Sequence, residues 1–308
     1  MRALALILAA LLTACGGGGG GSPAPATPTP QPVPPVAPPG APIATGDTAT
    51  DGYNWFNFRR AGVGLSTLAR NARLDAAAAG HSNYLRLNNT VTHEQVAGNP
   101  GYTGNTLQAR FTAAGYTLVN PYAYGEVISA AADPSGFYHA EELIAAIYHR
   151  FVILEPVFKE AGTGAATNAS NYTYFTADFT ANGGYGAGLG KGRIATYPSD
   201  GQTMVPTSFN SDTESPDPVP NLSTVGYPVS VHADISANIS VTTFSIKPRG
   251  GAEMTVRLLV NSGDAHTPKS AAAIIPLTTL RAATVYDVSF SGSVDGVALS
   301  RNWSFTTK

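Results

Sequence analysis

The chain contains a single cysteine, Cys15, so no disulfide bond can form within it. Any folded part must therefore be held together by packed hydrophobic cores and hydrogen bonds alone. The 308 residues are enough for two domains of ordinary size once terminal tails are set aside. Hydrophobic residues make up 43% of the chain and charged residues only 12%. Ser, Thr, Asn and Gly must therefore supply much of the polarity of the exposed surface.

The N-terminus has the pattern of an export signal. A short positive region, Met1-Arg2, precedes an apolar run over residues 3–12 and a small-residue cleavage site. The run is too short for a transmembrane helix, which needs about 20 apolar residues. The segment Leu12-Thr13-Ala14-Cys15 resembles the bacterial lipobox, whose cysteine is lipid-modified and becomes the first mature residue. We therefore predict a lipoprotein signal peptide over residues 1–15, lipidated at Cys15; the alternative is an ordinary signal peptide.

Residues 16–46 are predicted to be a disordered tether. A glycine run opens the segment, and a Pro/Ala/Thr-rich stretch follows that cannot bury a core. The tether would hold the folded part away from the membrane, which is the partner expected for a lipidated Cys15. We expect a location in the cell envelope, outside the cytoplasm. Gly16, by resemblance to known lipoprotein sorting, is compatible with the outer membrane if the organism has one.

The charge balance excludes one class of partner. Lys and Arg number 18 and Asp and Glu number 20, which gives a formal net charge of -2. Such a chain has no strong basic field to hold a polyphosphate backbone. We therefore predict no nucleic-acid partner.

Residues 47–197 read as an α/β layered domain. Apolar residues at helical spacing predict helices over 54–62, 68–87, 106–114 and 141–153. Residues 162–164 and 172–179 then predict two strands around a turn. Helices followed by a hairpin indicate a layered fold.

Residues 223–308 have the period-two pattern of short strands, separated by Gly, Pro and Asn turns. This pattern predicts a small β-sandwich. A Ser/Asp/Pro-rich linker over 198–222 is expected to precede it. The final segment, Asn302 to Thr307, resembles the last strand of bacterial Ig-like envelope domains.

Three short segments carry the candidate chemistry of the first domain: Thr92-His93, Gly125-Glu126-Val127-Ile128 and Tyr148-His149-Arg150. Their order, between the predicted helices and before a closing Gly-x-Gly hairpin, resembles the CAP superfamily (cysteine-rich secretory proteins, antigen 5, pathogenesis-related 1). The resemblance covers about residues 47–182 and is closest to the disulfide-free bacterial branch. It implies an α+β fold: a CAP-type α-β-α sandwich with an open cleft, followed here by the all-β Ig-like sandwich.

The resemblance also implies a cleft with two histidines and two acidic residues. His93, Glu126 and His149 match three of these positions, whereas Val127 stands where the family usually has asparagine. For the second acid the sequence favours Glu142, because it lies seven residues before His149, on the same face of a continuous helix. Glu94 and Asp178 are the alternatives.

Two imidazoles and a carboxylate that converge in a cleft can bind a divalent metal. His93 and His149 are the candidate ligands, with zinc as the first choice at roughly 2.0–2.2 Å. Without a metal, the carboxylate could orient a histidine as a general base, and a purely structural polar network is the remaining alternative. By contrast, His81 lies among apolar residues of a helix and is predicted to be a hydrogen-bonded core residue.

The sequence supports three functions for this protein. The first is a binding module whose His/Glu cleft takes a lipid, peptide or glycan ligand, with or without a divalent metal. The second is a metal- or His-dependent hydrolase of peptides or the cell wall, and the third is an adhesion protein or scaffold. We favour the first, because the chain has neither a His-Glu-x-x-His motif nor a Gly-x-Ser-x-Gly elbow.

Overall fold

The structure is a computed structural model that describes residues 38–308. The first helix of this part of the chain follows Asp47. The predicted signal peptide, its Cys15 and residues 16–37 of the predicted tether lie outside the described residues. The Asp47 side chain accepts a hydrogen bond from the backbone N–H of Thr50 and so caps α1 (Thr48–Gly62). Because of this cap, α1 begins earlier than the sequence pattern predicted.

The next two helices confirm the sequence prediction, and each also begins at a side-chain cap. Asn71 caps α2 (Ala72–Asn88), and Thr106 caps α3 (Leu107–Ala113). The cap at Asn71 starts α2 later than predicted. The two residues before it form the short strand β1 (Ala69–Arg70).

The helix predicted over residues 141–153 is wrong in one respect, because the structure has two helices there. They are α4 (Gly136–Ala145) and α5 (Ile147–Ile153), and Ala146 between them has an extended ψ of 118°. The distant Glu214 accepts hydrogen bonds from the N–H groups of Ile147 and Tyr148, at 2.8 and 2.6 Å. This cap starts a new helix at α5. Because Glu214 is distant in the sequence, no local pattern predicts this helix start.

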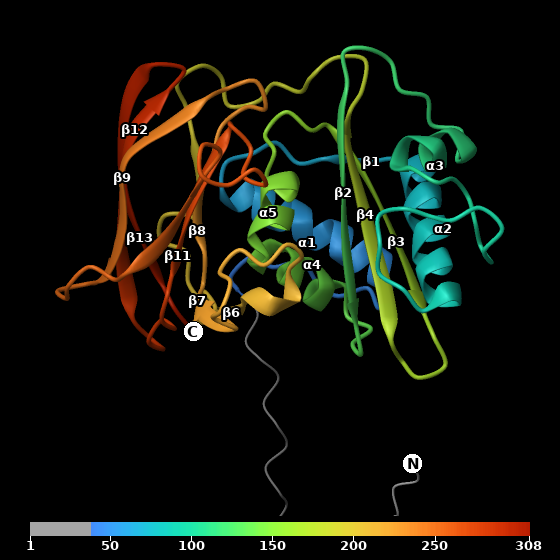
Figure 1. The fold of residues 1–308 in the computed structure, drawn as a ribbon, viewed down its shortest axis with the longest axis horizontal. Coiled ribbons are helices and arrows are strands. Elements are labelled where there is room, and N and C mark those ends of the chain that lie inside the picture. The colour runs from blue at the N-terminus through green and yellow to red at the C-terminus, as the bar shows by residue number, and fades with distance from the viewer. Residues whose placement is uncertain (1–37) are drawn as a thin grey trace, which may run out of the picture. The chain divides into compact units, whose positions relative to one another are not determined.

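The first sheet contains β1, β2 (Ala123–Ala131), β3 (Glu160–Thr167) and β4 (Thr173–Ala181), in the order β1-β3-β4-β2. The β3–β4 pair is the predicted hairpin. Helices α2 and α3 lie on one face of this sheet, and α1, α4 and α5 lie on the other (Figure 1). Gly164 explains how closely α2 approaches, because a Cβ at this position would collide with the backbone of Ala79.

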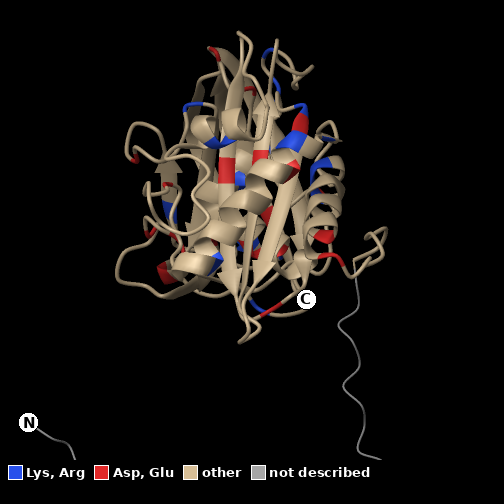
Figure 2. Cartoon of the chain, turned by 90° about the vertical axis from the view of Figure 1, so that its right-hand side faces the viewer, with Lys and Arg blue, Asp and Glu red and all other residues tan. Residues whose placement is uncertain are grey.

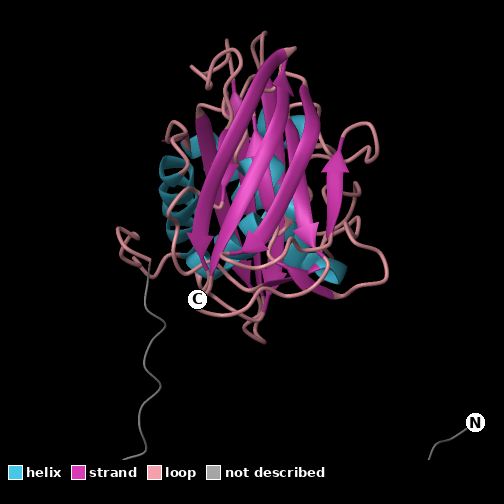
Figure 3. Cartoon of the chain, turned by 90° about the vertical axis from the view of Figure 1, so that its left-hand side faces the viewer, coloured by secondary structure: helices cyan, strands magenta, loops and turns pink. Residues whose placement is uncertain are grey.

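The remaining strands form an all-β region. One sheet has the order β10-β11-β8-β5, a second has the order β13-β12-β9, and a small one pairs β6 with β7. Figure 3 shows β9, β12 and β13 on the outer face of the molecule. The predicted fold class, an α+β region followed by an all-β region, is thus confirmed. The elements of this part are β5 (Ala195–Tyr197), β6 (Ser208–Asn210), η1 (Ser211–Thr213), β7 (Thr224–Gly226), β8 (Val229–His232), β9 (Ile239–Pro248), β10 (Val256–Val260), β11 (Ala271–Pro276), β12 (Val285–Val294) and β13 (Val297–Thr306).

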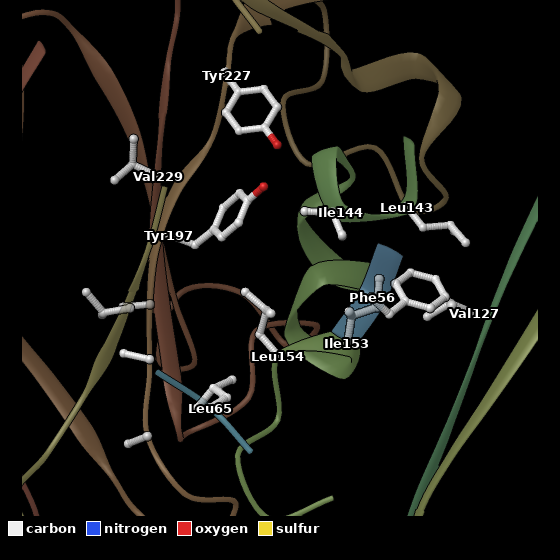
Figure 4. Close-up of a cluster of buried hydrophobic side chains, with 14 of the residues drawn as sticks. Phe56, Leu65, Val127, Leu143, Ile144, Ile153, Leu154, Tyr197, Tyr227 and Val229 are labelled. Atoms are coloured by element: carbon white, nitrogen blue, oxygen red, sulfur yellow. The ribbon is translucent and has the colours of Figure 1, made fainter. Parts of the chain in front are cut away.

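A continuous hydrophobic core runs from the helical layers into the all-β region. Phe56 of α1 and Ile153 of α5 belong to the same buried cluster as Tyr197 of β5 and Val229 of β8 (Figure 4). Residues 38–308 accordingly form one unit by their internal contacts. Strand β5, at the end of the predicted first domain, pairs with β8 of the predicted second domain. One sheet therefore contains strands from both predicted domains. Among these residues, no helix is long and apolar enough to cross a membrane.

Candidate active or binding site

His93 and Glu126 are brought into direct contact. His93 lies in the loop between α2 and α3, Glu126 lies on β2, and His93 Nδ1 is 2.9 Å from Glu126 Oε1. The carboxylate can only accept, so Nδ1 of His93 carries the proton and donates. The Glu126 side chain is 3% exposed and that of His93 is 58% exposed. The pair therefore joins a buried carboxylate to an imidazole that reaches solvent through its other nitrogen, Nε2.

Arg110 is a site residue that the sequence did not single out. It lies on α3 and is fully buried, and its Nη2 donates to both oxygens of Glu126 at 2.7 and 2.6 Å. Its Nη1 donates to the backbone carbonyl of His93 at 2.8 Å. Burial by itself raises the pKa of Glu126, but the hydrogen bond of His93 and the charge of Arg110 outweigh it, so this pKa is lowered. Glu126 is therefore ionised at neutral pH and holds His93 in place.

His81, behind this pair on α2, is a fully buried residue, as predicted. Its Nδ1 accepts from Gln95 Nε2 at 2.9 Å, so its Nε2 donates to the carbonyl of Thr92 at 2.8 Å. Burial, only partly offset by the Glu126 charge, lowers the pKa of His81 to about 4. The neutral ring thus anchors the backbone next to His93.

This neutral histidine leads to a pH prediction. Because the folded pKa of His81 lies below the unfolded value of 6.5, the unfolded chain takes up the proton first, and stability falls as pH falls through this range. The extra stability of wild type over His81→Asn should shrink by about 2 kcal/mol between pH 7 and pH 5. Urea unfolding at both pH values measures it. An equal gap at both would contradict a neutral buried His81.

Asp178, one of the two alternative second acids, lies next to Glu126. It is the cross-strand partner of Glu126 on β4, and its side chain is fully buried. Burial first, and then the neighbouring Glu126 charge, raise the pKa of Asp178 well above its usual value. Burial and the neighbouring carboxylate therefore both favour the protonated form of Asp178.

His149 lies on the other side of β2. Gly125 of β2 faces α5, because a Cβ there would meet the side chain of Val152. Alternation along the strand then turns Glu126 to the opposite face, toward α3. The Nδ1 of His149 is 3.1 Å from Oε1 of the buried Glu214. The structure thus brings His93 and Glu126 together and gives His149 a different carboxylate.

The two other acids named from the sequence, Glu142 and Glu94, lie in different parts of the structure. Glu142 is an exposed residue of α4 beside Tyr138, and partial desolvation raises its pKa. The break at Ala146 removes the continuous helix on which its pairing with His149 was predicted. Glu94, the exposed neighbour of His93, lines the same surface cavity as His93. Val127, where the family usually has asparagine, is fully buried in the core on the α5 side of β2.

These positions do not form a ligand set for zinc. Within residues 38–308, no group of at least three His, Cys, Asp or Glu side chains is placed to hold a metal ion. Glu126 is already bound by the Arg110 guanidinium, whose charge opposes a cation at the same carboxylate. The described residues therefore do not fit a zinc ion at this site.

His93 and Glu126 line a surface cavity of about 310 Å³. The larger cavity on β9, β12 and β13, about 930 Å³, lies against the exposed Arg249–Asp287 ion pair and hydroxyl side chains. We take the cavity beside His93 as the candidate site, because the His93 imidazole, held by Glu126, is exposed there. Its lining residues are His93, Glu94, Thr106, Leu107, Tyr124, Gly125 and Glu126.

Comparison with known proteins finds a family model that matches part of the chain. Residues 53–179 match the model of the cysteine-rich secretory protein (CAP) family. No curated protein matches the chain.

Of the solved structures that match the chain, three are similar to it over about half of its length. An extracellular protein with an SCP domain from Bacillus anthracis is 21% identical with a TM-score of 0.37, over 45% of this chain and 44% of that one. The chain therefore spans less than half the length of that protein. An outer surface protein from Borrelia burgdorferi is 16% identical with a TM-score of 0.38, over 46% and 96% of the two chains. Venom allergen-like protein 4 from Schistosoma mansoni is 9% identical with a TM-score of 0.31, over 46% and 92%.

Proposed function

We propose that the CAP domain of residues 53–179 is a binding module that holds a small polar ligand, a glycan unit or a peptide, in the His93–Glu126 cavity. One observation carries this proposal: His93 is fixed through Nδ1 by a buried carboxylate, while its imidazole remains exposed in the cavity. A preorganised ring of this kind recognises a hydrogen-bonding group at little entropic cost.

The lining of the cavity favours a polar ligand over a lipid chain. Leu107 and Tyr124 are its large apolar residues, and the half-exposed Tyr124 ring could cover one face of a sugar or a peptide. His93, Glu94 and Thr106 offer hydrogen bonds beside it. Basic and acidic residues are few and intermixed on the side of the molecule that carries α2 and α3 (Figure 2). A strongly charged ligand is therefore not favoured.

Binding is tested by NMR titration with two probes, an N-acetylglucosamine tetramer and a tri-alanine peptide. We expect saturable shifts at His93 and Tyr124 with one of the probes. His93→Ala and Glu126→Gln should each weaken that binding at least about tenfold, because each removes or releases the fixed imidazole. His266→Ala, an exposed histidine of the all-β region, is the matched control and should bind as wild type does. Unchanged affinity in the folded His93→Ala variant would contradict the proposal.

A hydrolase is the second candidate, and the same dyad favours it. With Nδ1 hydrogen-bonded to Glu126, the Nε2 atom of His93 could take a proton from water or substrate. Turnover of either probe that disappears in His93→Ala would replace the binding module by this alternative. Under the main proposal, the probes bind but are not cleaved.

We also propose that lipidated Cys15 anchors the protein in the cell envelope, with an Ig-like β region that spaces or docks the CAP domain. The lipobox resemblance and the Gly/Pro-rich residues that follow support this arrangement. Cys15→Ser should abolish incorporation of labelled fatty acid and release the protein from the membrane fraction, since the thiol is the acylated group. Labelling that persists in Cys15→Ser would be incompatible with an anchor at this residue.

A further inference from the structure

Asp178 has the surroundings of an acid that donates a hydrogen bond. Its side chain is fully buried, and neither carboxyl oxygen accepts a hydrogen bond from any donor among residues 38–308. An ionised carboxylate in such a place would carry a charge that no donor stabilises. A protonated acid requires only one acceptor for its O–H.

Glu126 is the acceptor that the strand register provides. The two residues are directly opposite on the antiparallel strands β2 and β4, so their side chains lie on the same face of the sheet. Residues in this relation have Cβ atoms about 4.5–5.5 Å apart. On its other side, Asp178 is opposite Gly162 of β3, which has no side chain and is covered directly by α2.

The charged groups that face Asp178 and Glu126 compensate only one negative charge. From α3, Arg110 supplies one positive charge; its Nη2 donates to both oxygens of Glu126 and its Nη1 to the carbonyl of His93. From α2, His81 faces Glu126 at 4.0 Å and is neutral. From the surface, His93 donates a single hydrogen bond to Glu126. Two buried carboxylates beside one guanidinium would repel each other strongly.

We propose that Asp178 and Glu126 form a buried carboxyl pair with a single negative charge, in which the Asp178 acid donates to the Glu126 carboxylate and positions it for His93. The inference deepens the proposed binding site and rests on it for its purpose. Asp178 touches no ligand itself and acts through Glu126, so its role is that of a positioning residue. In this role it replaces the second cleft acid that the sequence placed at Glu142.

The first experiment needs no ligand, so its outcome does not depend on the proposed function. Difference infrared spectra of the full-length protein at pH 7 compare wild type with Asp178→Asn. We expect the C=O band of a protonated carboxyl that is present in wild type and lost in the variant. The matched control is Asp287→Asn, an exposed carboxylate paired with Arg249, which should leave that band unchanged. A spectrum in which Asp178→Asn removes an ionised-carboxylate band would overturn the inference.

The second experiment tests the positioning role. Asp178→Asn keeps an N–H donor for Glu126, whereas Asp178→Leu has none. The asparagine variant should bind the probe within about twofold of wild type, and the leucine variant at least about fivefold more weakly. Equal weakening in both folded variants would overturn the positioning role. If the leucine variant does not fold, the asparagine variant and the infrared spectra still decide the question, and an absence of probe binding in wild type would count against the proposed function alone.

Discussion

Replacing Arg110 with methionine is expected to lower the free energy of unfolding by about 3–5 kcal/mol. Methionine fills a similar space, but it leaves the buried Glu126 without the two hydrogen bonds and the positive charge that compensate it. The carbonyl of His93 also loses its donor. Denaturant unfolding followed by circular dichroism measures the change.

The loss should depend on pH in a direction that identifies its cause. Without Arg110, burial raises the folded pKa of Glu126 above the unfolded value of 4.5, so the variant loses stability as pH rises through the interval between them. The deficit of Arg110→Met relative to wild type should therefore be larger at pH 8 than at pH 5. Arg249→Met removes an exposed ion pair and should change stability far less. A deficit that is independent of pH would indicate lost packing instead of an uncompensated carboxylate.

The contrast between His93 and Arg110 shows what the sequence could predict about the site. His93 and Glu126 stand in short segments that a family pattern marks, and the structure places them in contact. Arg110 stands in an ordinary amphipathic helix, where a charged residue reads as solvent-exposed. Its burial follows from the packing of α3 against α2 and from its contact with Glu126 of β2, and no local pattern encodes such tertiary contacts. An arginine one turn after the Thr106 cap, on a short helix that follows the His93 loop, is the only signal that could have suggested it.

The separation of His93 from His149 has a similar origin. The family resemblance predicted one cleft with both histidines, and only the pairing of Glu142 with His149 assumed a continuous helix over 141–153. Residues 198–222 were predicted to be a linker. In the structure, Glu214 from within that segment caps α5 and binds His149. A helix cap from a residue far along the chain cannot be predicted from hydrophobic periodicity. Caps such as Asp47 and Thr106 directly precede their helices and can be recognised in the local sequence.

The same long-range contacts lead to the second large prediction, in which Arg150→Met destabilises the helical and all-β regions together. Arg150 of α5 is fully buried, and its guanidinium donates to the carbonyl of Pro228 at 2.7 Å and to that of Ile144 at 2.6 Å. It also lies over the rings of Tyr197 and Tyr227, at 4.7 and 5.0 Å from their centroids. Methionine would leave both buried carbonyls without this donor, at a cost of about 3–5 kcal/mol in total.

The two tryptophans of the chain allow each region to be followed separately, since Trp55 lies on α1 and Trp303 on β13. Trp303→Phe leaves a reporter in the helical region, and Trp55→Phe leaves one in the all-β region. Because Arg150 and the shared core join the regions, both reporters should unfold at one urea concentration, and Arg150→Met should shift both midpoints equally. Arg301→Met, an exposed change on β13, should shift neither. A shift confined to the Trp55 reporter would mean that the all-β region folds on its own, as the predicted boundary at residues 198–222 would require.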